Sequence, residues 1–173
     1  MVKDIIMEKK QKSITAKRLE NIALYYLGRY DSSSFNLQRI LRQRVEKSRR
    51  LGADVPPEAS SWIDEVVAKM QSYGYLDDKR YAENLVRRLR NASRSQSFIR
   101  LKLAENGIGE DIISALDLSS AEDEEAALRW AKKHGLGKNP DNYTKDLAKL
   151  GRAGFSYEDA RKALENCRNE EEI

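Results

Sequence analysis

The stretch Leu103-Ala-Glu-Asn-Gly-Ile-Gly-Glu-Asp111 has a counterpart about 47 residues later, Leu150-Gly-Arg-Ala-Gly-Phe-Ser-Tyr-Glu158. Both follow one pattern: Leu, three residues, Gly, an apolar residue, two residues and an acid. Gly favours the left-handed backbone that ends many helices, and the apolar residue after it packs against the helix end. An acid in the first turn of the next helix is stabilised by the helix dipole. The pattern therefore predicts a recurring junction between two helices, as in a repeat protein.

On both sides of these junctions, apolar residues recur every three to four positions, which is typical of amphipathic helices. Nine such segments lie between Thr15 and Cys167. The glycines expected to end helices are Gly52, Gly74, Gly107, Gly135 and Gly154. The polar residues expected to begin them include Asp77, Ser95, Ser119 paired with Glu122, and Ser156 paired with Asp159. The sequence therefore predicts nine helices.

The nine helices fall into three sets of three, which predicts an all-α fold of three tandem three-helix, helix-turn-helix-like repeats. We expect repeats over residues 15–76, 77–118 and 119–168, with polar tails over 1–14 and 169–173. Neighbouring repeats of this kind share a modest core and leave long faces exposed.

Residues capable of catalysis are scarce, so we expect no enzyme activity, no cofactor and no metal. His134 is the only histidine, and its place just before Gly135 favours a helix-capping role. Cys167 is the only cysteine and lies on an apolar stripe, which favours a buried thiol. Neither a P-loop nor a dinucleotide-binding glycine motif is present. Of the aromatic residues, we expect Trp62 and Trp130 in the core and Tyr25 and Tyr143 at the surface.

The chain has no apolar run long enough to span a membrane, and its single cysteine fits a reducing compartment, so we expect a cytoplasmic monomer. Its net charge is only +4, but the charges are grouped. Most charged residues in 39–50 and all charged residues in 87–102 are basic, whereas all charged residues in 110–125 are acidic. These blocks predict either a surface that docks on a charged partner or simply solvated helix faces.

The segment Gly74-Tyr-Leu-Asp-Asp-Lys-Arg-Tyr-Ala-Glu83 resembles the signature of the RecX family, the regulators of the RecA recombinase. The similarity extends from about Lys17 to Cys167. It departs from the commonest pattern at Tyr30, at Asn36 and in an insertion over 44–54. The resemblance implies an elongated, curved array of repeats that binds RecA and the RecA–single-stranded-DNA filament. It also implies inhibition of strand exchange and ATP hydrolysis, in the setting of the SOS response.

Basic residues are the candidate contacts to such a filament or to phosphates. They are Arg39, Arg42, Arg49, Arg50, Arg87, Arg88, Arg94, Arg100 and Lys102. The same residues suit two alternatives. One is an autonomous DNA-binding protein that uses helix-turn-helix units, with weak direct DNA affinity also compatible with filament binding. The other is a helical adaptor that binds only protein.

Overall fold

The computed structural model describes residues 13–119 and 122–169, and these ranges contain helices but no strand. The all-helical prediction is therefore confirmed for this part of the chain. Most of the two expected tails, residues 1–12 and 170–173, lies outside the described residues. The chain divides into two compact units, Met1–Asp78 and Lys79–Ile173.

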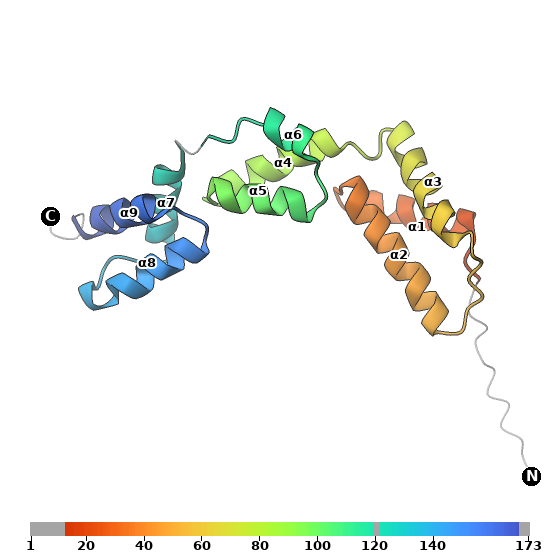
Figure 1. The fold of residues 1–173 in the computed structure, drawn as a ribbon, viewed down its shortest axis with the longest axis horizontal. Helices are drawn as coiled ribbons and strands as arrows, with labels where there is room; N and C mark the ends of the chain where they lie inside the picture. Colours follow the sequence, from red (N-terminus) through yellow and green to blue (C-terminus); the bar gives the residue numbers. More distant parts are fainter. Residues whose placement is uncertain (1–12, 120–121, 170–173) are drawn as a thin grey trace, which may run out of the picture. The chain divides into compact units, whose positions relative to one another are not determined.

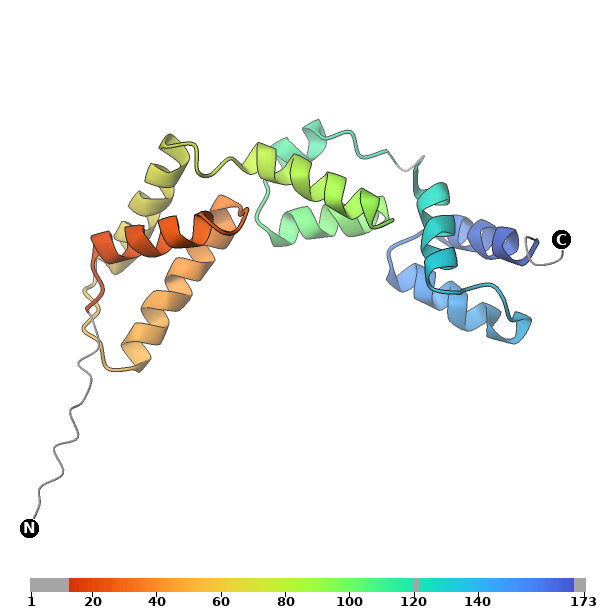
Figure 2. The ribbon, with the colours of Figure 1, turned by 180° about the vertical axis from the view of Figure 1, so that it is seen from behind.

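The first unit holds three helices packed around one core (Figures 1 and 2). They are α1 (Ala16–Leu27), α2 (Ser34–Arg50) and α3 (Ala59–Ser72). Their apolar stripes meet at residues such as Leu19, Leu41 and Met70, each with no exposed surface. Ile14, just before α1, is also buried in this core, and Trp62 packs partly buried against it. Ile14 was predicted to belong to the N-terminal tail, so the core includes a residue just before the predicted repeat 15–76.

The second unit contains two further cores, each built from consecutive helices. The first involves α4 (Asp78–Asn91), α5 (Gln96–Glu105) and α6 (Glu110–Ala115). The next involves α7 (Asp123–Lys133), the short 3-10 helix η2 (Pro140–Asn142), α8 (Tyr143–Arg152) and α9 (Tyr157–Asn169). Together with the first unit, the described chain thus buries its apolar residues in three successive clusters, as expected of tandem three-helix repeats.

The two junctions that share a sequence pattern also share a backbone geometry. Gly107 and Gly154 have φ values of +72° and +92°, the left-handed region predicted for them. The amide of Ile108 donates to the carbonyl of Leu103 at 3.1 Å, and the amide of Phe155 donates to that of Leu150 at 3.2 Å. Each apolar residue after the glycine is buried, so the turn is fixed by hydrogen bonding and packing together.

One local prediction was wrong. Tyr143 is half-buried rather than exposed, because it packs against the core of α7–α9. A 3-10 residue, Glu122, precedes α7, and residues 120–121 lie outside the described residues, so the expected Ser119–Glu122 capping box stays a prediction. The first residue of α7, Asp123, accepts from the backbone N–H of Gln96 at the start of α5. By contrast, Ser95 caps α5 and Ser156 caps α9 as predicted.

Candidate partner-binding surface

Helix α5 places an aromatic ring between two cations. Phe98 and Lys102 are four residues apart on α5 and so share one side of the helix, whereas Arg94 lies just before the N-cap residue Ser95. The Arg94 guanidinium lies 4.8 Å from the centre of the Phe98 ring, and the Lys102 ammonium lies 5.4 Å from it. Lys102 also pairs with Glu105 at 2.6 Å. A half-buried ring flanked by cations can contact a base or an apolar side chain while the cations contact an anion.

The last turns of α4 add two exposed arginines to this unit. Arg87 donates to the side-chain oxygen of Asn84 at 2.7 Å. The side chain of Arg88 is exposed and forms no ion pair or hydrogen bond with the described residues. Neither charge is neutralised by a carboxylate among the described residues, so both remain able to contact an anionic partner.

Arg100 does not join the aromatic group on α5. Its guanidinium lies 3.8 Å from the carboxylate of Glu110, the first residue of α6. The basic residues of 87–102 therefore do not form one continuous group on the surface. Arg94 and Lys102 flank Phe98, whereas Arg100 faces the acidic start of α6.

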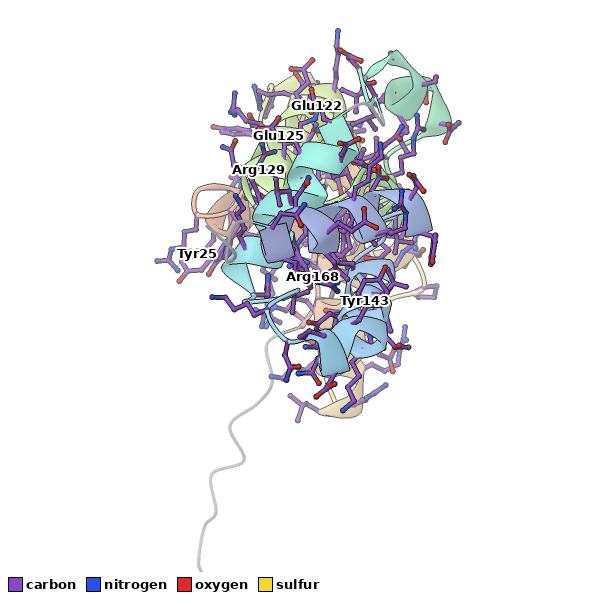
Figure 3. The ribbon with its side chains drawn as sticks, turned by 90° about the vertical axis from the view of Figure 1, so that its left-hand side faces the viewer. Tyr25, Glu122, Glu125, Arg129, Tyr143 and Arg168 are labelled. Carbon is purple, nitrogen blue, oxygen red and sulfur yellow. The ribbon has the colours of Figure 1, made fainter. Side chains whose placement is uncertain are left out.

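Behind Arg94, polar residues join the helices α4–α6 to α7. The backbone N–H of Gln96 donates to Asp123 at 2.9 Å, and Arg90 pairs with Glu122 at 3.2 Å. A cavity of about 20 Å³, enough for roughly one water molecule, lies among these side chains. Figure 3 labels Glu122, Glu125 and Arg129 on α7, and the last two pair at 2.6 Å. Glu122 and Asp123 link the two sets of helices, which is a structural role for part of the acidic block, whereas Glu125 pairs within α7.

Burial raises the pKa of the Asp123 carboxyl above its ordinary value, because desolvation penalises the charged form. The hydrogen bond from Gln96 and the charge of Arg90 oppose this rise, whereas the nearby acids Asp159 and Glu122 add to it. The contact between α5 and α7 therefore includes a carboxyl group whose ionised form is disfavoured by burial.

In the first unit, the remaining candidate contacts line one stripe of α2. Arg39, Arg42, Arg49 and Arg50 all lie within about a quarter-turn of one another around the helix axis. Glu46 lies in the middle of the stripe and pairs with Arg49 at 2.7 Å and Arg50 at 3.3 Å. The stripe is therefore less basic than its composition suggests. Arg42 is the member whose side chain has no partner among the described residues.

Three residues with favourable positions were not among the predicted contacts. Phe98 lies between two predicted cations; its four-residue spacing could have indicated the contact with Lys102, but not the contact with Arg94, which lies before the helix. Arg44 and Lys47 were counted in the basic block but not selected; Arg44 lies on a different side of α2 from the stripe, and Lys47 lies between that side and the stripe. A helical projection of 39–50 would have separated the two sides.

His134 and Cys167, the two residues considered for catalysis, both have positions that stabilise the fold. His134 caps the end of α7, stacks on Trp130 with ring centres 3.9 Å apart, and bonds that residue's carbonyl through Nδ1 at 2.8 Å. Cys167 is buried, as predicted. No cluster of three metal-ligating side chains occurs within 13–119 and 122–169. Over the same ranges, each helix is too short or too polar to cross a bilayer.

A family model described as the second three-helix domain of RecX matches residues 77–116, the range that contains α4, α5 and α6. The regulatory protein RecX of Myxococcus xanthus (strain DK1622) is 34% identical over 168 residues, which cover 91% of this chain and 90% of that protein. The chain belongs to the RecX family. This confirms the resemblance inferred from the segment that begins at Gly74.

Solved structures support the same fold for this RecX-family chain. The crystal structure of RecX from Lactobacillus salivarius matches with a TM-score of 0.59 at 23% identity, covering 88% of this chain and 96% of that one. A crystal structure of a regulatory protein RecX matches with a TM-score of 0.63 at 23% identity, covering 84% of this chain and 70% of that one. At this level of identity the matches show the fold of the RecX-family chain, not its contacts.

Proposed function

We propose that this RecX-family protein is a non-enzymatic regulator that binds RecA and the RecA–single-stranded-DNA filament. Binding inhibits strand exchange and ATP hydrolysis and so regulates recombination and DNA repair in the cytoplasm, within the SOS response. Membership of the RecX family carries the proposal, because a relative that matches nearly the whole chain is named a regulatory protein. The lack of a catalytic arrangement at His134 and Cys167 agrees with a role exerted by binding.

The surface proposed to make the contact is the basic side of α4 and α5. Arg87, Arg88 and Arg94 supply charge that can pair with phosphates or with acidic side chains of the filament. Phe98 adds an apolar contact between Arg94 and Lys102. The α2 stripe is a weaker contact, because Glu46 neutralises part of it.

The test is a titration of RecA ATPase activity on single-stranded DNA with the full-length protein. We expect inhibition at stoichiometric amounts. The triple variant R87A/R88A/R94A should require at least about tenfold more protein for the same inhibition, because several anion contacts are lost.

A charge-matched control is available on helices α7, α8 and α9. Lys133, Lys145 and Arg168 are exposed and form no side-chain bonds with the described residues, and Figure 3 labels Arg168 near the end of α9. The triple variant K133A/K145A/R168A removes the same charge and should inhibit like the unchanged protein. If both triple variants lose inhibition equally, net charge rather than the α4–α5 surface is responsible. If the unchanged protein does not inhibit at all, the proposed function fails.

Autonomous DNA binding is the second candidate, favoured by the cation–aromatic–cation arrangement at Phe98. It predicts that the protein alone binds DNA with an affinity that falls steeply with salt concentration. A flat salt dependence, together with inhibition of RecA, would reject this candidate and leave the filament as the target.

A further inference from the structure

A groove of about 520 Å³ runs between α1 and α2 in the first unit. Its volume lies within the range of about 300–1,000 Å³ seen for binding pockets in proteins. Its lining includes Ile22, Tyr25, Arg44, Lys47 and Leu51. None of the nine candidate filament contacts is in this lining, although Lys47 also borders the α2 stripe beside Arg42 and Arg50.

The rim of the groove is cationic. Arg18, Arg44 and Lys47 are the charged residues of the lining, and no acid is among them. The exposed side chains of Arg44 and Lys47 form no ion pair or hydrogen bond with the described residues. This differs from the α2 stripe, where Glu46 neutralises its neighbours. The groove therefore offers charge that an acidic partner can pair with.

The floor and ends of the groove are apolar. Ile14 is buried and Ile22 half-buried between the helices, whereas Tyr25 and Leu51 are 65% and 52% exposed. Figure 3 shows the Tyr25 side chain projecting away from the ribbon. The Arg29 guanidinium lies 3.9 Å from the centre of the Tyr25 ring, which holds the ring in place. Exposed apolar side chains beside a groove are typical of a protein-binding surface.

We propose that the α1–α2 groove binds an acidic amphipathic segment of a partner protein. Apolar side chains of the segment pack on Ile22, Tyr25 and Leu51, and its carboxylates pair with Arg44 and Lys47. An amphipathic helix that lays its apolar face in a groove is a common mode of recognition. The inference goes beyond the proposed function and does not depend on it, because it involves none of the same residues.

Two other occupants fit less well. Single-stranded DNA would match the cations, but a mostly aliphatic floor with one tyrosine offers few rings for bases to stack on. The segment 1–12 of the chain itself carries four lysines and two acids, so its net charge has the same sign as the groove. Charge and apolar lining together favour an acidic amphipathic peptide.

The probe is a fluorescent synthetic peptide of about 18 residues, long enough to form a helix, with Leu on one face and Glu on the other. Fluorescence polarisation with the full-length protein should show saturable binding. The variant R44E/K47E should weaken it at least about tenfold, since attraction becomes repulsion. K133E/K145E reverses the same charge on exposed lysines of α7 and α8 that are not in the groove lining, and it should change the affinity less than about twofold.

A second pair of variants tests the apolar part. Y25A should weaken binding of the peptide several-fold, whereas Y73A, which removes a tyrosine that is 61% exposed outside the groove, should not. Equal effects of R44E/K47E and K133E/K145E, or no effect of Y25A, would overturn the proposal. Binding of an oligo-dT probe that is lost in R44E/K47E, with no binding of the peptide, would overturn it in favour of nucleic acid. Circular dichroism should show unchanged helicity in all four variants.

Discussion

Gly151 and Gly154, three residues apart at the end of α8, should respond in opposite ways to alanine. Gly154 has a φ of +92°, and a Cβ there would lie 2.5 Å from Ser95 Oγ and 3.3 Å from the amide nitrogen of Phe98. G154A should therefore destabilise the protein by about 1–3 kcal/mol. Gly151 is helical with no atom within 4 Å of an added Cβ, so G151A should stabilise by about 0.5–1 kcal/mol.

Urea unfolding of the two variants measures this difference. A change of the same sign in both would contradict the left-handed turn at Gly154 and its close approach to α5. It would also remove the physical reason for the pattern that begins at Leu150.

Asp123 should give the protein a distinctive pH dependence. Burial raises its pKa above the ordinary value of 3.8, so the folded protein binds this proton more tightly than the unfolded chain. Its contribution to the free energy of unfolding should therefore fall as pH rises from about 3.8 through the folded pKa, and stay level above it. D123N keeps an acceptor for Gln96 but cannot ionise, so it should gain stability relative to the unchanged protein across that interval.

Urea unfolding between about pH 3.5 and pH 7 gives the comparison, because Asp side chains titrate in the lower part of this range. Parallel profiles for D123N and the unchanged protein would show that burial does not shift the Asp123 carboxyl.

At the scale of single helices, the caps of α5 and α9 should differ in strength. Ser95 Oγ accepts from the amide of Phe98 at 3.2 Å and donates to the carbonyl of Ala153 at 3.0 Å in a fully buried setting. Ser156 Oγ is exposed and serves only its own helix through Asp159. S156A should therefore cost about 1 kcal/mol, the usual value of a cap.

S95A should cost about 2–3 kcal/mol, because the buried carbonyl of Ala153 also loses its donor. Thermal or urea unfolding of the two variants measures both values. Equal costs would mean that Ser95 does not link α5 to the turn after α8.

Local signals explain which elements could be predicted from the sequence. Gly107 and Gly154 end their helices as predicted, because the left-handed turn depends on a few adjacent residues. The start of α7 was predicted from Ser119 on similar local grounds, and the α-helix begins at Asp123, after the 3-10 residue Glu122. The contact from Asp123 to Gln96 spans 27 residues, and helix-start patterns contain no information about it.

The candidate surface was predictable in composition but not in grouping. Sequence spacing could identify the basic block that includes Arg94 and Arg100. It did not show that Arg94 lies against Phe98 whereas Arg100 faces Glu110 of α6. That difference depends on where α6 packs, which is a tertiary property. Tyr143 was misplaced for the same reason, since its burial comes from packing against the core of α7–α9.

At the scale of the whole molecule, the three separate cores predict local rather than uniform responses to core mutations. Leu41 and Leu150 are both fully buried, one in the core of α1–α3 and the other in that of α7–α9. L41A and L150A should each cost about 2–5 kcal/mol in their own core. Hydrogen exchange should show that L41A reduces amide protection in α1–α3 and leaves α7–α9 unchanged, whereas L150A should do the reverse. Loss of protection throughout the chain in either variant would contradict independent cores.

RecA-driven strand exchange, measured with stoichiometric full-length protein, tests the proposed regulation most directly. The unchanged protein and K133A/K145A/R168A should inhibit exchange to the same extent. R87A/R88A/R94A should remain folded by circular dichroism and require at least about tenfold more protein for the same inhibition. Strand exchange and RecA ATP hydrolysis that are both unaffected by the unchanged protein would contradict the proposal that it regulates RecA.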